Sequence, residues 1–372
     1  MQRAHQIRLY PTREQEIQLK KTAGASRYAY NWALAKWKSM YEAVEKREST
    51  EKPTAFGLVN KWTQERPDWS HEVSRDAQNK AIINVGDAFK NLWKGKSQYP
   101  QFHKKGHKDS FYVPNNKAQV LNGRISLPKI GKVRLAEEIR YEGKIMSYTV
   151  SGYAGQWHVS VQVETPDKEI PCLDKASVVG IDVGLKHIAV ASDGSVLDAP
   201  ESLTALQQKL KWEQRKLSHK QKKSNNYHKQ LKRKQKIQLR INNIRKDVSH
   251  KFTTSIAKSH GTVAIENLNI KGMMEHAGKH LRSSLAQSIM SEVLRQLEYK
   301  AHRVVKVDRF FPSSKRCSRC GHVKEQLDLS ERTYKCESCG LVLDRDYNAA
   351  CNLMYAGTVG PGVPVEQTAS RL

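Results

Sequence analysis

The sequence predicts an α/β fold with a mixed sheet, preceded by a helical module and a β-rich module. Residues 12–96 show the three- and four-residue spacing of apolar side chains that is typical of helices. Residues 100–164 instead alternate between apolar and polar side chains, as strands with one buried face do. From residue 178 onward, short apolar strands alternate with helical segments, which indicates helices packed on a sheet.

The N-terminal part is expected to contain one strand followed by helices. Residues 5–10 alternate like a short strand. Thr12 and Gln15 then form a capping-box signature, in which each side chain bonds the other residue's backbone N–H and opens a helix. Longer helical segments, each with one apolar face, follow over about residues 26–45 and 72–93.

The β-rich part is expected to contain a hairpin and a half-buried strand. Asn122-Gly123 separates two apolar runs, which is a strong short-range signal for a two-residue hairpin. Residues 157–163 alternate strictly, starting from Trp157. Residues 166–176 have the character of a linker.

The last part is expected to form the layered α/β fold. Its elements, in order, are a buried strand at 178–183, a hairpin at 188–197, a basic helical stretch to about 250, a strand at 263–265, a helix over 285–297, a strand at 304–307, and a final helix from about Tyr347.

The charge of the chain favours a polyanionic partner. The formal net charge is +27, and proteins that neutralise phosphates gain affinity by releasing counterions. An acidic membrane surface is the rival partner, but the chain lacks a basic amphipathic helix with a bulky apolar face. The N-terminus has no signal-peptide pattern and no run is long enough to span a membrane. We therefore expect an intracellular nucleic-acid-binding protein in a reduced cytoplasm.

Four of the six cysteines have the spacing of a zinc ribbon. Two C-x-x-C pairs are separated by fifteen residues, and each pair would supply two thiolates to one Zn²⁺: Cys317, Cys320, Cys336 and Cys339. A structural role, as a folding staple, is favoured over direct reading of bases. His322 is a further candidate ligand, but four thiolates already fill a tetrahedral site.

Three carboxylates are candidates for magnesium-dependent catalysis. Asp182 lies within an apolar strand, where an ionised carboxylate is costly unless a cation compensates it. Glu266 ends a second apolar strand, and Asp346 lies at the start of the last helix. Three acids converging on one sheet would hold two Mg²⁺ ions for hydrolysis of a phosphodiester bond.

Each acid also has an ordinary structural explanation. Asp182 could belong to a turn, Glu266 could simply end its strand, and Asp346 could complement the helix dipole. Asp344 competes with Asp346 for the catalytic role. His187, near the first acid, is expected to be a strand-face histidine and not a ligand.

A basic helical hairpin is expected between residues 203 and 250. Residues 209–246 contain fifteen Lys and Arg but one acid, Glu213, and two apolar faces are separated by a break at Ser224. This imbalance favours phosphate contact over a merely solvated face. A second basic segment, near Tyr99, mixes cations with aromatic residues. The expected nucleic-acid contacts are Lys104, Lys105, Lys222, Lys223, Lys232, Arg233 and Lys234.

Together these motifs resemble the TnpB family, transposon-encoded RNA-guided endonucleases that are compact relatives of type V CRISPR effectors. Gly-Ile-Asp182-Val-Gly resembles the first RuvC motif of that family, and Ile-Glu266-Asn-Leu resembles the second. Asp-Arg-Asp346-Tyr-Asn-Ala-Ala resembles the third, whose second acid is the catalytic one in the family. The segment around Cys317 is similar to the family's zinc ribbon, and Arg27–Leu34 and Pro100–Phe111 are similar to its N-terminal patterns.

The resemblance implies an RNase-H-like (RuvC) nuclease domain with a zinc-ribbon insertion, a wedge β-barrel and a helical recognition lobe. The expected bounds are 1–11 and 97–170 for the wedge, 12–96 for the recognition lobe, 176–309 and 343–356 for the nuclease domain, 310–342 for the ribbon, and 357–372 for a disordered tail.

The resemblance also implies RNA-guided cleavage of DNA beside a short adjacent motif, in the context of transposition, by a cytoplasmic protein associated with the nucleoid of a bacterium or archaeon. The implied partners are a guide RNA from the transposon end and target double-stranded DNA, with two catalytic Mg²⁺ ions and one structural Zn²⁺. The residues alone indicate only a zinc-containing, metal-dependent nuclease with a basic surface. An RNA-independent transposase or junction nuclease remains open, as does a guide-RNA-dependent DNA-binding repressor, although the intact acids speak against the repressor.

Overall fold

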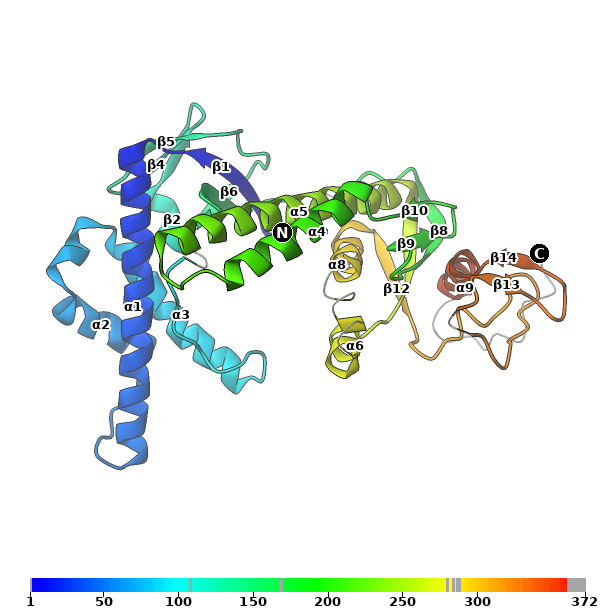
Figure 1. Cartoon of the computed structure of the whole chain (residues 1–372), viewed down its shortest axis with the longest axis horizontal. Coiled ribbons are helices and arrows are strands. Elements are labelled where there is room, and N and C mark those ends of the chain that lie inside the picture. Colours follow the sequence, from blue (N-terminus) through cyan, green and yellow to red (C-terminus); the bar gives the residue numbers. More distant parts are fainter. Residues whose placement is uncertain are drawn as a thin grey trace. The chain divides into compact units, whose positions relative to one another are not determined.

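The computed structural model in Figure 1 describes residues 2–359, apart from 107–108, 167–169, 279–280, 283–284, 286–288 and 329. The chain divides into two compact units, Met1–Lys168 and Glu169–Leu372. Among the described residues, no helix combines the length and the apolar character needed to cross a membrane.

The first unit begins with the strand β1 (Gln2–Tyr10) and the long helix α1 (Arg13–Glu45). The predicted capping box is confirmed, with reciprocal bonds between Thr12 and Gln15. The sequence predicted two helical segments over residues 13–45. No proline lies within this range, so the two segments form one continuous helix.

Two further helices share an aromatic core with α1. The helix α2 (Ala55–Glu65) was not predicted, because its apolar face is short and a proline flanks it on each side. The helix α3 (Arg75–Trp93) starts later than predicted, because residues Asp68–Glu72 form a separate 3₁₀ turn. The core of these helices includes Leu34, Trp37, Trp62, Ile82 and Phe89.

A seven-stranded antiparallel sheet completes the first unit. Its order is β2-β6-β7-β1-β5-β4-β3. The strands that follow β1 are β2 (Asp109–Pro114), β3 (Gln119–Leu121), β4 (Arg124–Leu127), β5 (Gly131–Leu135), β6 (Lys144–Tyr153) and β7 (Gln156–Glu164). Among the described strands, pairing ends at β2 and β3, so the predicted barrel is an open one.

Two local predictions for this sheet are confirmed. Asn122 and Gly123 link β3 to β4 with φ values of 50° and 66°, as a two-residue hairpin turn requires. In β7, Trp157 and the alternate valines that follow it are buried. Together with Ile7 and Leu9 of β1, these side chains form the core beneath the sheet.

A five-stranded mixed sheet forms the centre of the second unit, as predicted. Its order is β10-β9-β8-β11-β12, with β8, β11 and β12 parallel and β9 and β10 antiparallel. The predicted linker 166–176 is shorter than expected, because Asp174 already pairs with His260. The strands are β8 (Asp174–Asp182), β9 (Ala189–Ala191), β10 (Val196–Leu197), β11 (His260–Glu266) and β12 (Arg303–Val307).

Helices cover both faces of this mixed sheet (Figure 1). Val263 of β11 faces a core shared with α5 and α8, whereas the next residue, Ala264, faces α9. The elements of this unit outside the sheet are α4 (Glu201–Ser218), α5 (Asn225–Ser259), α6 (Ile270–His276), α8 (Met290–Lys300), β13 (Thr333–Lys335), β14 (Val342–Asp344) and α9 (Arg345–Val359).

Two glycines allow α9 to lie directly on the sheet backbone. A Cβ atom at Gly180 of β8 would lie 2.0 Å from the carbonyl oxygen of Ala350. A Cβ atom at Gly357 would lie 2.6 Å from the Cβ of Ala264 in β11. No larger side chain fits at either point without moving the helix, so the glycines fix how closely the helix approaches the sheet.

The last helix is longer than predicted. It was expected to begin near Tyr347 and to give way to a disordered tail at residue 357, but it extends to Val359. Gly357 is buried within it, and this packing offsets the low helix propensity of glycine. Residues 360–372 of the predicted tail lie outside the described residues.

Candidate functional site

The mixed sheet brings two of the predicted acids to one edge. The strand β8 ends at Asp182, and its parallel neighbour β11 ends at Glu266. Ile181 pairs with Ile265, so the residues that follow them, Asp182 and Glu266, lie side by side at the same edge of the sheet. In open α/β sheets, this carboxyl edge is where ligands bind.

The third acid, Asp346, lies in the first turn of α9, the helix held against β8 at Gly180. Burial is the main cause that raises the pKa of Asp182 to about 7, and the charges of Asp346 and Glu266 raise it further. Burial also raises the pKa of Glu266. Because such repulsion acts over short distances, the three carboxylates share one region.

The three carboxylates are spread more widely than the ligands of a single ion. Among the described residues, only the four ribbon cysteines bring three or more ligand atoms within 4.8 Å of one another. Two Mg²⁺ ions held about 3.5–4 Å apart accept oxygen ligands over a wider region. Carboxylate oxygens are the hard donors that divalent cations such as Mg²⁺ prefer, so this donor set fits such ions.

The neighbours of Asp346 have separate structural roles. Asp344 Oδ1 accepts the backbone N–H groups of Asp346 and Tyr347 at 2.9 and 3.1 Å, so its carboxylate caps α9. Arg345 Nε lies 3.3 Å from Asp346 Oδ1, and its positive charge lowers the pKa of Asp182. Arg345 was not predicted. Its only signal in the sequence is its position between two acids.

The histidines near the two predicted metal sites have other partners. His187 Nδ1 lies 2.7 Å from Asp198 Oδ1. The backbone carbonyl of His322 accepts the N–H of Cys317 at 2.8 Å, and its side chain is not part of the four-sulfur group. His187 lies in the turn between β8 and β9 and not on a strand, so the prediction of a strand-face histidine is wrong. That neither histidine is a metal ligand stays a prediction.

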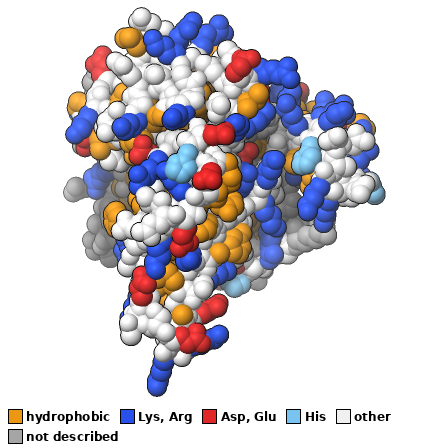
Figure 2. Space-filling view, turned by 90° about the vertical axis from the view of Figure 1, so that its left-hand side faces the viewer, with side chains coloured by type: hydrophobic (Ala, Val, Ile, Leu, Met, Phe, Trp, Pro, Cys, Tyr) orange, Lys and Arg blue, Asp and Glu red, His pale blue; other side chains and the backbone are white. Residues whose placement is uncertain are grey.

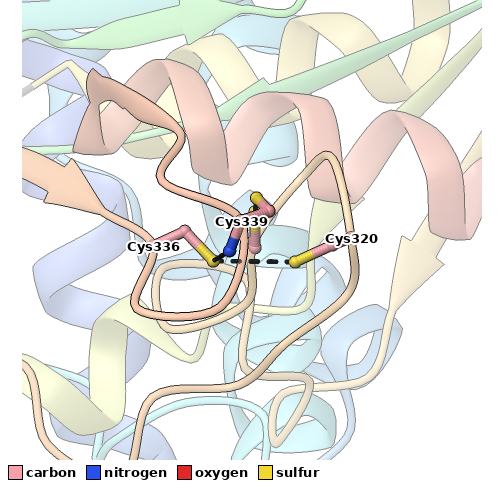
Figure 3. A group of neighbouring side chains, drawn as sticks. Cys320, Cys336 and Cys339 are labelled. Atoms are coloured by element: carbon pink, nitrogen blue, oxygen red, sulfur yellow. Dashed lines mark hydrogen bonds between the residues drawn. The ribbon is translucent and has the colours of Figure 1, made fainter.

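The sulfur atoms of the four cysteines lie within 4.8 Å of one another, and Figure 3 shows three of these residues, Cys320, Cys336 and Cys339. The Cys317 and Cys339 sulfurs are 3.6 Å apart, and so are those of Cys320 and Cys336. Four thiolates bound to one Zn²⁺ at about 2.3 Å would lie about 3.8 Å apart. The glycine after each second cysteine has a positive φ, 77° and 71°. This closed set of four ligands is typical of a structural site.

Two buried asparagines tie the ribbon to α9. Asn348 Nδ2 donates to the carbonyl of Arg316 at 2.7 Å, and its Oδ1 accepts the N–H of Ser318 at 3.0 Å. Asn352 Nδ2 donates to the carbonyls of Ser313 and Arg316 at 2.9 and 2.7 Å. Neither asparagine was predicted, although their i, i+4 spacing on the last helix was a usable signal.

The predicted basic hairpin is formed by α4 and α5, with Ser224 capping α5. Glu213, the one acid of residues 209–246, is buried and accepts hydrogen bonds from Gln230. It therefore does not neutralise the surface of the hairpin. Of the predicted contact residues on it, Lys234 is half-buried and the others are exposed: Lys222, Lys223, Lys232 and Arg233.

Lys104 and Lys105 are exposed in the first unit, near further cations and aromatic rings. Lys38 Nζ lies 5.0 Å from the ring centre of Tyr99 and 5.1 Å from that of Phe102. Exposed rings beside cations are typical of surfaces that stack bases and contact phosphates. Lys and Arg side chains are also spread over the face drawn in Figure 2.

Three family models match separate parts of the chain. The model described as "Probable transposase" (OrfB_IS605) matches residues 158–277. The model of a "Cas12f1-like, TNB domain" matches residues 291–353, which include the four cysteines. A "Helix-turn-helix domain" model matches residues 1–46, where the structure has β1 and α1.

A solved structure shows the class of fold. The chain resembles the Cas12f1 protein of a Cas12f1–sgRNA–target DNA complex with a TM-score of 0.56 and 17% identity, covering 91% of this chain and 82% of that one. The fold is therefore that of the compact Cas12-type effectors, and the predicted fold class is confirmed.

Curated relatives show the family. The chain is 32% identical to "Putative RNA-guided DNA endonuclease InsQ" of Escherichia coli (strain K12), covering 95% of this chain and 92% of that protein. It is 31% identical to a "Putative RNA-guided DNA endonuclease" of Streptomyces pristinaespiralis, covering 100% and 94%. The chain belongs to the TnpB family of transposon-encoded proteins, as its motifs suggested.

Proposed function

We propose that the chain is an RNA-guided DNA endonuclease of an insertion-sequence transposon, which cuts target DNA by hydrolysing phosphodiester bonds. The nuclease assignment is supported by Asp182 and Glu266 at one sheet edge and by Asp346 in the first turn of α9, and by the pKa of Asp182, which burial and then the charges of the other two acids raise to about 7. Carboxylates with such unfavourable energies cluster at functional sites. Family membership supports the RNA-guided part of the assignment.

The three acids would hold two Mg²⁺ ions. When bound, the ions activate a water molecule and stabilise the leaving oxygen of the cleaved bond. Asp182, Glu266 and Asp346 would supply the carboxylate ligands, and the charges of both other acids act on Asp182. Arg345 offsets part of the negative charge and orients the carboxylate of Asp346.

The four cysteines would hold one structural Zn²⁺, because their sulfur spacing suits one ion and four thiolates fill a tetrahedral site. The hydrogen bonds from Asn348 and Asn352 of α9 to the ribbon give this ion a second effect. By ordering the ribbon, it would support the helix that carries Asp346. Cys317, Cys320, Cys336 and Cys339 are the proposed ligands.

Guide RNA from the transposon end and double-stranded target DNA are the proposed partners. The net charge of +27, the exposed basic hairpin and the names of the relatives support them. Residues 1–11 and 97–170 would form the wedge and residues 12–96 the recognition lobe of such a complex. With DNA as its substrate, the protein would act at the nucleoid.

The RNA dependence separates this proposal from an RNA-independent transposase or junction nuclease. The test is to purify the protein from cells that carry its transposon end, sequence the RNA that copurifies, and assay cleavage before and after RNase treatment. We expect one discrete RNA that contains the transposon end, and loss of cleavage after RNase. Cleavage that survives RNase treatment would favour the alternative enzymes.

A further inference from the structure

Two adjacent phenylalanines after β12 have opposite environments. Phe311 packs against the core beneath α9, which includes Val305. Phe310 is 82% exposed. Asp308 holds the turn between strand and rings, since its Oδ1 accepts the N–H of Phe310 at 2.7 Å and its carbonyl accepts that of Phe311 at 3.1 Å. The exposure of Phe310 is therefore imposed by a hydrogen-bonded turn.

This turn lies at the same sheet edge as the candidate catalytic acids. Glu266 pairs with Val307, the last residue of β12, so Asp308 leaves the sheet directly beside Glu266. The N–H of Asn267 also donates to the carbonyl of Val307 at 3.1 Å. An open hollow of about 460 Å³ lies between the two strand ends, lined by Asn267, Leu268, Asn269, Asp308, Arg309 and Phe310.

Arg309 adds a positive charge to the exposed ring. Its guanidinium carbon lies 5.2 Å from the ring centre of Phe310. Arg295 and Tyr299 of α8 form a similar pair, but there the Arg295 guanidinium donates a hydrogen bond of 2.6 Å to Glu292. Among the ion pairs of the described residues, none involves Arg309. Its charge can therefore serve an external anion.

An aromatic face and a cation at one hollow match the two parts of a nucleotide. A base can stack on the ring, and the guanidinium can contact the adjacent phosphate. In a duplex, each base is already stacked between its neighbours, so only an unpaired strand offers a free base face. A polar lining of two asparagines also suits a nucleotide better than an apolar protein segment.

We propose that Phe310 and Arg309 form a platform for single-stranded DNA next to the phosphodiester bond that is cut. The proposal rests on the proposed nuclease function and adds the two residues that would hold the strand beside the carboxylates. Phe310 would hold one base beside Glu266, and Arg309 would hold the phosphate that follows. The platform is a binding surface and takes no part in the bond cleavage itself.

The test compares Phe310→Ala and Phe310→Trp in the full-length protein with its copurified RNA. Target DNA carries 2-aminopurine at successive positions around the cut, because stacking quenches its fluorescence. Without divalent metal, we expect one position to be quenched by the wild type and by Phe310→Trp, but not by Phe310→Ala. With Mg²⁺, we expect Phe310→Ala to slow cleavage roughly 5- to 100-fold, the loss of about one base stack, at an unchanged half-saturating Mg²⁺ concentration.

Tyr299→Ala is the matched control, since it removes a half-exposed ring beside an arginine elsewhere in the same unit. We expect it to change neither readout. The platform is refuted if Phe310→Ala quenches and cleaves like the wild type. If the wild type cuts no DNA, the proposed function fails, whereas the quenching pattern still decides whether Phe310 binds the strand.

Discussion

At Asp182, burial and two negative neighbours disfavour the ionised carboxylate that metal binding requires. Its pKa of about 7 in the folded protein lies above the ordinary value of 3.8, so the folded state holds a proton that the unfolded chain releases. The stability from this proton is complete below about pH 3.8 and is lost as the pH rises through about 7. Bound divalent cations would remove this conflict.

Asp182→Asn should therefore stabilise the metal-free protein at neutral pH. Relative to the wild type, we expect a higher melting temperature at pH 8 in EDTA and a smaller difference at pH 5, where Asp182 is protonated. Each kcal/mol corresponds to roughly 2–4 °C for a unit of this size. Asp68→Asn, at an exposed aspartate, is the control and should give a pH-independent difference. A destabilised Asp182→Asn at pH 8 would contradict the electrostatic account.

At the scale of single residues, the side chains with distinctive chemistry could be predicted, but the residues that position or stabilise them could not. Asp182 was recognisable because a carboxylate inside an apolar strand is costly. Arg345 and Asn352 act through contacts with residues that are near in space, and the pattern around each of them does not reveal these partners. Asp344 and Asp346 could not be separated by pattern, because only the backbone geometry shows that Asp344 caps α9.

At the scale of elements, α9 joins the ribbon to the sheet, so zinc removal should affect more than the ribbon. Cys320→Ser should lose about one equivalent of zinc and lower the melting temperature of the second unit. Cys172→Ser is the control, since Cys172 lies outside the four-sulfur group, and should retain the metal. Metal content and thermal melts measure both effects. Unchanged stability after zinc loss would contradict the coupling.

Asn352→Ala tests the contact between the ribbon and α9. It would leave the carbonyls of Ser313 and Arg316 without this buried donor, which costs about 1–3 kcal/mol. We expect a lower free energy of unfolding, measured with denaturant, while one equivalent of zinc remains bound. Loss of the zinc in this variant would show that Asn352 stabilises the metal site itself and not the contact between the ribbon and α9.

Elements with local signals were predictable and those that depend on tertiary packing were not. The capping box at Thr12 and the Asn122-Gly123 hairpin follow from local hydrogen bonding and backbone conformation. The helix α2 has little pattern of its own and is stabilised by burying Leu58 and Trp62 against its neighbours. The extension of α9 through Gly357 likewise depends on the sheet beneath it.

At the scale of the whole molecule, charge should govern affinity for nucleic acid. Replacing Lys222, Lys223, Lys232, Arg233 and Lys234 by Gln should flatten the dependence of log K on log salt by about 0.9 for each phosphate that the variant no longer neutralises. Filter binding over a salt series measures this slope. Lys20→Gln with Lys36→Gln is the control, because both lysines are paired with glutamates. An unchanged slope in the five-residue variant would make the hairpin a solvated face.

The order of helical, β-rich and α/β regions along the chain was predictable, because each has its own hydrophobic period. The pairing of β1 with β5 and β7 was not predictable, since strands that are distant in sequence leave no local pattern of their pairing. The same limit applies to the acids. Their common sheet edge follows from the parallel register of β8 and β11, which only the folded chain provides.

The most direct test of the nuclease site is the cleavage of target DNA by RNA-loaded Asp182→Ala, Glu266→Ala and Asp346→Ala, measured beside target binding. We predict that each variant binds its target like the wild type and cuts it at least about 100-fold more slowly, as expected for the loss of a group that stabilises the transition state. Asp344→Asn, which keeps a capping side chain, should still cut. Wild-type cleavage by any of the three alanine variants would contradict the assignment of these acids to one metal-binding centre.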